Sequence, residues 1–288
     1  GGTIRFVLAD PVSLQGGSFG FYSGTAEFDR NMDVDPSANA TLDALFGPSV
    51  SISAGKEFSV TGAATLLGEV SLTGGTLTVS DLANPHFLQF DSGTLRLTQA
   101  DLAIGAGGLC GWSLTVAADM TMDVANTVAV ASDARLSIDG GRFAAGELLN
   151  FGHVEMSGSP SLLSGAAFAN HAFFDGDGAI SAPLNNAAAG QVRVTPGERL
   201  AFTGSGNINA GVLVVDGGSI EMSQDLTNSG RITADDGAFR AGASVSNTAS
   251  GSIVGTGDVT LAFDGGLDNH GVVGLSAAEA ALRGDITN

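Results

Sequence analysis

An asparagine, in most copies followed shortly by a glycine, recurs through the second half of this chain, from about residue 148 to residue 288. The recurring residues are Asn150, Asn170, Asn186, Asn209, Asn228, Asn247, Asn269 and Asn288. Successive members lie 20, 16, 23, 19, 19, 22 and 19 residues apart, a mean period of about 20. A chain that winds round a solenoid returns to one corner once per coil, which gives a period of this length. An antiparallel sandwich, with its short strands and glycine turns, is the alternative, but it has no reason to repeat one corner.

The residue types of this phrase suit a corner. Asparagine tolerates the left-handed backbone region, and glycine enters positive φ at no steric cost. We therefore expect both residues to turn the chain. Side-chain amides that stack at one corner can also bond to each other along the axis, as in cross-β stacks. The eight asparagines are predicted to form such a ladder.

A second phrase begins with two glycines, as in Gly74-Gly75-Thr76-Leu77, Gly140-Gly141-Arg142-Phe143 and Gly217-Gly218-Ser219-Ile220. A short run with alternating apolar residues follows each copy, which is typical of half-buried strands. Together the two phrases predict an all-β fold, a parallel β-helix of about 20 residues per coil. Parallel crossovers are almost always right-handed, so a right-handed helix is expected.

No sharp change of composition divides the chain, so residues 1–288 are predicted to form one solenoid domain. Its pattern breaks near the N-terminus, where a non-repeat insertion is expected around residues 29–47. Pro36 and Gly47 frame a predicted short helix over residues 39–46 of this insertion.

Charge and composition exclude several classes of partner. Eleven basic residues face thirty acidic ones, a formal net charge of −19, and Lys56 is the one lysine. Nucleic acids and anionic membrane surfaces are bound through basic patches, so neither is an expected partner. No apolar run is long enough for a membrane helix, so membrane insertion is not expected. The single cysteine, Cys110, lies beside Leu109 and Trp112 and is predicted to be a small buried hydrophobe rather than a catalytic thiol.

Two stretches carry a resemblance to a known class of protein, Asp225-Leu226-Thr227-Asn228-Ser229-Gly230-Arg231-Ile232 and Gly266-Leu267-Asp268-Asn269-His270-Gly271-Val272-Val273. They resemble the degenerate repeats of bacterial secreted and surface β-solenoids, such as autotransporter passenger domains and adhesin-like or extracellular-matrix proteins. The resemblance implies a right-handed parallel β-helix and an extracellular or bacterial cell-surface location. It is a repeat style without an active-site signature, so it assigns no functional residue.

The strongest metal candidate is the run Asp29, Asn31, Asp33 and Asp35, which places an oxygen-bearing side chain at every second position. Calcium takes six to eight oxygen ligands, and this run supplies the beginning of such a loop. Val34 and Ala40 stand where an EF-hand has its glycine and its bidentate glutamate. A solvated acidic edge is therefore the alternative, and no other cofactor is expected.

Parallel β-helices also include polysaccharide lyases and glycosidases, which need carboxylates or a basic residue on one exposed face. Asp91, Arg96 and Asp101 are candidates for a shared face. Outward charged residues of alternating strands explain the same pattern, and an enzyme is not expected. His153, His171 and His270 lie near ladder asparagines at unlike offsets, which does not predict a zinc site.

These features predict a structural, extracellular β-solenoid: a stalk, an adhesin segment or a head-to-tail fibre subunit. The alternative is a carbohydrate-active β-helix enzyme or a carbohydrate-binding module. Asn288 belongs to a coil that the sequence does not complete, so we expect end-to-end self-association or continuation of a longer chain. A surface polysaccharide or a host surface is a further possible partner.

Overall fold

The computed structural model of the chain describes residues 3–6, 12–15, 25–28, 32–35, 49–55, 57–65, 69–83 and 88–288, with side chains described for 54–55, 71–82, 89–276 and 281–288. All regular structure in these residues is strand. No helix among them is long and apolar enough to cross a membrane. The strands are β1 (Thr3–Phe6), β2 (Val12–Gln15), β3 (Thr25–Phe28), β4 (Met32–Asp35), β5 (Ser49–Ser53), β6 (Glu57–Thr65), β7 (Glu69–Ala83), β8 (Leu88–Leu97), β9 (Leu102–Ile104), β10 (Ser113–Ala117), β11 (Met120–Val130), β12 (Arg135–Asp139), β13 (Arg142–Asn150), β14 (His153–Ser157), β15 (Leu162–Asn170), β16 (Phe173–Gly176), β17 (Gly178–Ile180), β18 (Leu184–Asn186), β19 (Gln191–Val194), β20 (Arg199–Phe202), β21 (Asn207–Asn209), β22 (Val212–Asp216), β23 (Ser219–Met222), β24 (Leu226–Asn228), β25 (Arg231–Asp235), β26 (Ala238–Ala241), β27 (Val245–Asn247), β28 (Ser252–Asn269) and β29 (Val272–Thr287).

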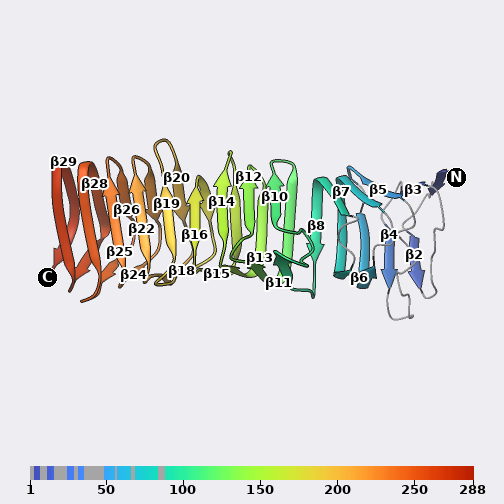
Figure 1. Cartoon of the computed structure of the whole chain (residues 1–288), viewed down its shortest axis with the longest axis horizontal. Coiled ribbons are helices and arrows are strands. Elements are labelled where there is room, and N and C mark those ends of the chain that lie inside the picture. The colour runs from blue at the N-terminus through green and yellow to red at the C-terminus, as the bar shows by residue number, and fades with distance from the viewer. Residues whose placement is uncertain are drawn as a thin grey trace.

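The strands stack as coils along one axis, with the N- and C-termini at opposite ends of the rod (Figure 1). Each coil in the second half contributes three strand segments, and each segment pairs in parallel with its counterpart one coil later. For example, β22, β23 and β24 of one coil pair with β25, β26 and β27 of the next. The rod therefore has three faces, which we call the first, second and third face in this order. A parallel β-solenoid of about 20 residues per coil is confirmed, and its hand stays a prediction.

Alternating side chains fill the interior, as the period-two runs predict. Register places each inward residue against the same position of the next coil, as in the row Leu200, Ile220, Phe239 and Leu261 of the second face. All four side chains are fully buried. The largest fully buried side chains are those of Phe143, Phe168, Phe174, Phe202, Phe239 and Phe263. The core is a set of apolar rows that run parallel to the axis.

The glycine pairs turn the corner between the first and second faces. Gly140 and Gly217 have positive φ, both 73°. The glycine that follows each of them lies against carbonyl oxygens of the preceding coil, where a Cβ would overlap. This corner therefore needs glycine both for its backbone conformation and for close coil packing.

The predicted N-terminal insertion falls partly on β4, which pairs in parallel with β2 and with β6. Residues 32–35 are thus a strand of the stack. Residues 29–31 and 36–47, including the predicted helix, lie outside the described residues.

Candidate functional site

The eight asparagines form the predicted ladder. The Nδ2 atom of each donates to the Oδ1 atom of the next, at 2.8 Å for the first two steps and 2.7 Å for the other five. The seven steps run without interruption from Asn150 to Asn288. One row of amides therefore links eight consecutive coils along the axis.

The ladder is inside the rod and its donors are satisfied. Six of the asparagines, from Asn150 to Asn247, are fully buried, and Asn269 is 7% exposed. The second N–H of each buried amide reaches a backbone carbonyl, usually one at the start of the next coil, as Asn228 Nδ2 does with the oxygen of Ser252 at 3.4 Å. Buried polar groups cost little when they are paired in this way. The amides hold neighbouring coils in register without placing a charge in the core.

Asparagine is not needed at these positions to turn the backbone, as the sequence had suggested. Each ladder asparagine from Asn150 to Asn269 is the last residue of a strand, with its side chain pointing inward. Among the described residues, only Asp236 has positive φ without being a glycine. The expected left-handed asparagine corner is therefore wrong. Asparagine is needed for its amide, which both donates to the next coil and accepts from the previous one.

The glycines that follow the ladder asparagines are likewise not needed for positive φ, which was the expected reason. Gly211, Gly230 and Gly271 are absent from the residues with positive φ. A Cβ on each would overlap the carbonyl oxygen of the glycine one coil earlier, for example that of Gly211 beneath Gly230. These same carbonyls accept the first strand N–H of the next coil, as Gly211 does from Arg231 at 2.8 Å. Glycine is needed here because the backbones of successive coils touch.

The ladder position continues toward the N-terminus with apolar residues. Asn150 pairs in register with Val130, and Val130 with Ile104, both fully buried. The Oδ1 atom of Asn150, which has no amide before it, accepts from the backbone N–H of Gly152 at 3.0 Å. The change from amide to aliphatic side chains explains why the sequence period is weak before residue 148.

One further buried asparagine, Asn207, lies outside the ladder. Asn207 is 1% exposed and pairs in register with Leu226, in a row that is otherwise apolar. Its Oδ1 accepts from the backbone N–H of Leu184 at 3.0 Å, and its Nδ2 donates to the carbonyl of Gly204 at 2.7 Å. The side chain thus replaces backbone bonds at an irregular corner. No repeat of the asparagine pattern marks it, so its role was not visible in the sequence.

The three histidines within the described residues do not form a site. His153 pairs with Asp175 at 3.0 Å, and the ring of His171 stacks on that of Phe151 with centroids 4.8 Å apart. His270 lies 3.5 Å from Asp268. Among the described residues, no group of three or more His, Cys, Asp or Glu side chains is arranged to hold a metal ion.

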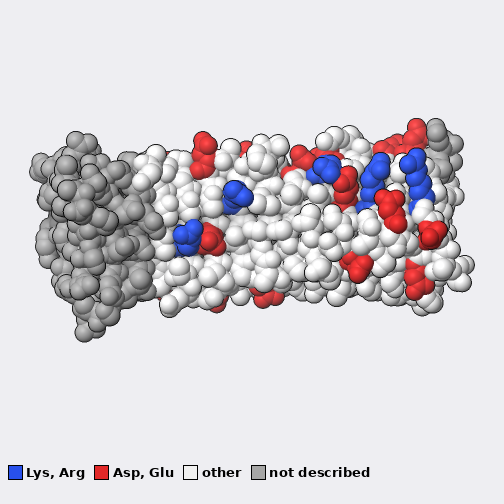
Figure 2. Space-filling view, turned by 180° about the vertical axis from the view of Figure 1, so that it is seen from behind, with Lys and Arg blue, Asp and Glu red and all other residues white. Residues whose placement is uncertain are grey.

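Ion pairs on the first face link neighbouring coils. Arg135 pairs with Glu155, and the guanidinium of Arg193 lies 2.5 Å from a carboxylate oxygen of Asp216. On the face in Figure 2, basic side chains lie singly or beside acidic ones rather than in one continuous patch. Exposed pairs of this kind contribute little stability each.

The proposed sharing of one face by Asp91, Arg96 and Asp101 is wrong. Arg96 lies on the second face and pairs with Asp123 at 3.1 Å. Asp91 comes before that segment in the coil, where it accepts from Gln89 at 2.8 Å. Asp101 directly precedes β9 on the third face. Two corners of the coil separate the three side chains, because each face takes only about three to five residues.

Cys110 is half-buried and packs against the core. Burial raises the pKa of its thiol to about 11. The thiol is therefore protonated at neutral pH, in agreement with the predicted small hydrophobe.

The calcium candidate cannot be assembled from the described side chains. Asp29 and Asn31 lie outside the described residues, and Asp33 and Asp35 belong to β4, where only the backbone is described. Calcium binding at this run stays a prediction.

Comparison with known proteins returns no relative: no family model, curated protein or solved structure matches the chain. The likeness to bacterial surface and secreted solenoids stays a resemblance of repeat style, carried by the corner phrases.

Proposed function

We propose that this chain is a structural rod of the extracellular or bacterial cell-surface kind, acting as a stalk or adhesin segment or as a head-to-tail fibre subunit. The buried asparagine ladder is the observation that carries the proposal. It links coil to coil with neutral hydrogen bonds that neither salt nor a change of pH near neutrality disrupts.

The architecture supports a mechanical role. In the described part of the chain every pairing between named strands is parallel and joins neighbouring coils, so the backbone bonds run along the axis. Pulling on the ends of the rod loads these bonds and the ladder together. A stack of this kind keeps its cross-section while it grows in length, which suits a spacer that holds something away from a surface.

The last coil supports an axial contact. Leu275, Leu282 and Ile286 of β29 are 43%, 39% and 41% exposed. The latter two pair in register with Leu261 and Leu267, which are buried in the coil before. A further β coil, from a second copy or from more of the same chain, would cover these apolar positions and continue the strand pairing.

Negative-stain electron microscopy over a range of concentrations tests this proposal. Filaments with a repeat equal to the rod length would support a fibre subunit, and rods of constant length would support a segment of a stalk or adhesin. Leu282→Lys should abolish the filaments, while Ser223→Lys, an exposed position outside the last coil, should leave them intact. Compact particles at every concentration would contradict the rod.

Surface labelling of intact producing cells tests the location. An antibody against the folded chain should bind without permeabilisation. Binding that appears only after permeabilisation would contradict an extracellular role.

A further inference from the structure

One coil of the rod is shorter than its neighbours. The step from Asn170 to Asn186 takes 16 residues, whereas the steps before and after it take 20 and 23. The largest part of the difference, three residues, lies at the corner between the first and second faces. A single residue, Asp177, joins β16 to β17, but four residues form the same corner in each flanking coil, 158–161 and 195–198. The outline of the rod dips at β16 between two projecting corners (Figure 1).

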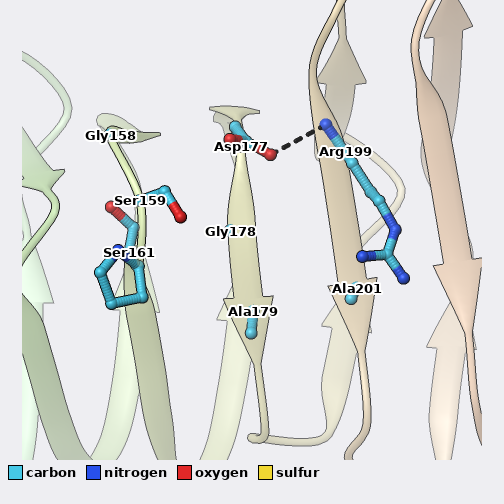
Figure 3. Close-up of a pocket in the computed structure, with 9 residues that line it drawn as sticks. Gly158, Ser159, Ser161, Asp177, Gly178, Ala179, Arg199 and Ala201 are labelled. Atoms are coloured by element: carbon cyan, nitrogen blue, oxygen red, sulfur yellow. Dashed lines mark hydrogen bonds between the residues drawn. The ribbon is translucent and has the colours of Figure 1, made fainter.

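The short corner leaves a groove along the edge of the second face. Two adjoining hollows, with volumes of about 210 and 350 Å³, share Pro160, Ser161 and Ala179 in their linings. The loop that contains Ser159 lies on one side of β17 and Arg199 lies on the other (Figure 3). The short corner at Asp177 thus leaves open the space beside the loop 158–161, which lines both hollows, and the following coil contributes Arg199 and Ala201 of β20.

The wall formed by residues 158–161 is held in place by Ser161, which is 2% exposed. Its Oγ accepts from the backbone N–H of Gly140 at 2.8 Å and lies within bonding distance of the carbonyls of Ile138, at 3.0 Å, and Ser157. A loop fixed by a buried hydroxyl keeps the groove open without a ligand. Preformed sites lose less entropy on binding.

The floor of the groove is small and apolar. Leu162, Ala179 and Ala201 follow each other in register on successive coils, and all three are half-buried. Together with the ring of Pro160 they present a surface of C–H groups. Such a surface suits the apolar face of a flat or ring-shaped ligand.

The charged groups around the floor differ in whether another charged side chain already pairs with them. Arg142 lines one end, is exposed, and forms no ion pair within the described residues. At the other end the Arg199 guanidinium is turned to Glu221, 2.5 Å away, and this hydrogen bond lowers the pKa of Glu221. Asp177 lines the hollow and accepts from the backbone N–H of Arg199 at 3.0 Å through Oδ1, which leaves Oδ2 as a further acceptor.

We propose that this groove binds an acidic polysaccharide segment. A sugar carboxylate would pair with Arg142, ring hydroxyls would bond to Asp177 and Ser159, and ring C–H groups would lie on the floor. Acidic sugars combine these three chemistries in one molecule. Arg142 and Ala179 are two coils apart, roughly 10 Å along the axis, so a chain of at least two rings is required. This inference does not depend on the rod acting as a stalk or fibre.

Calorimetric titration with tetraglucuronate and with cellotetraose, the same chain without carboxylates, tests the proposal. The unmodified protein should bind tetraglucuronate, with affinity that falls as salt rises, and should bind cellotetraose at least tenfold more weakly. Arg142→Gln should weaken tetraglucuronate binding by at least tenfold and leave cellotetraose unchanged. Arg231→Gln removes an exposed first-face arginine and should change neither.

A second variant separates the groove from general charge. Ala179→Phe places a ring in the hollow from an outward position, so it should abolish binding with an unchanged melting temperature. Failure of the unmodified protein to bind tetraglucuronate at millimolar concentration would overturn the proposal. Equal losses for Arg142→Gln and Arg231→Gln, or full binding by Ala179→Phe, would overturn it as well. None of these results bears on filament formation.

Discussion

Replacement of Asn228 by aspartate tests the ladder most directly, because it changes one amide to a carboxyl of the same shape. Asn228 is fully buried in the middle of the row, with Asn209 donating to it and Asn247 accepting from it, both at 2.7 Å. An ionised carboxyl would be a buried acceptor facing the acceptor oxygen of Asn247. A protonated carboxyl keeps one donor where the amide has two.

Both possibilities have a calculable cost. Holding the introduced carboxyl protonated at pH 7 costs about 1.4 kcal/mol for each pH unit above its unfolded pKa of about 3.9, or about 4 kcal/mol. The lost donor adds about 1 kcal/mol. An ionised carboxyl instead leaves the oxygens of Asn247 and Ser252 without a donor, which costs at least about 2 kcal/mol. We therefore expect Asn228→Asp to lower the free energy of unfolding by about 2–5 kcal/mol at pH 7.

The loss of stability caused by Asn228→Asp should increase with pH. The introduced carboxyl has a folded pKa above its unfolded value, so its penalty grows as the pH rises through the unfolded pKa. At pH 4 nearly all of the penalty for protonation disappears, and only about 1 kcal/mol from the lost donor remains. Relative to the unmodified protein at each pH, the variant should recover most of its stability on acidification.

Urea unfolding followed by circular dichroism at pH 7 and pH 4 measures these values. Asn185→Asp is the matched control, since Asn185 is the exposed neighbour of a ladder residue and its change should cost less than about 0.5 kcal/mol. Equal unfolding midpoints for the two variants at pH 7 would refute a buried, bonded ladder. A loss for Asn228→Asp that does not change with pH would refute the electrostatic reasoning.

Three further predictions concern the corners, the thiol and one ion pair. Gly230→Ala should lower the free energy of unfolding by about 1–3 kcal/mol, because its Cβ overlaps a carbonyl of the preceding coil. Gly274→Ala is the control: it has open space around its Cβ and should be nearly neutral in the same urea titration. Cys110 should react with a thiol reagent far more slowly than a free cysteine at pH 8, and this reaction should become faster as the pH rises toward 11. A reaction rate at pH 8 equal to that of the unfolded chain would contradict the burial of the thiol. The lowered pKa of Glu221 means that its pairing with Arg199 stabilises the fold above the ordinary carboxyl range, and this stabilisation is lost as the pH falls through the lowered value. Glu221→Gln should therefore cost less than about 1 kcal/mol at pH 7, and the cost should shrink on acidification. A cost that stays constant as the pH falls would show that the effect is not electrostatic.

The period of the asparagines was sufficient to predict the solenoid, because a coil that returns to one corner must spend a fixed length of chain on each turn. Alternation in runs such as residues 219–222 correctly predicted which side chains point inward. The physical account of the corner was wrong, however. Residue types that favour positive φ also suit close backbone packing and amide stacking, and sequence alone does not separate these causes.

The groove was not recognised, although its signal was present in the 16-residue step from Asn170 to Asn186. A short coil becomes a groove only when the corners on both sides project, and that depends on where each coil places its extra residues. The error for Asp91, Arg96 and Asp101 has the same origin, because the positions of the two intervening corners decide which face each residue occupies.

The sequence by itself determined the repeating architecture and the eight residues of the ladder, since both follow from a period along one chain. Only the tertiary structure decided how those residues act. Whether an asparagine turns the backbone or bonds to the next coil, and whether a short corner is filled or left open, depends on contacts between segments about 20 residues apart. Those contacts exist only after the coils have stacked.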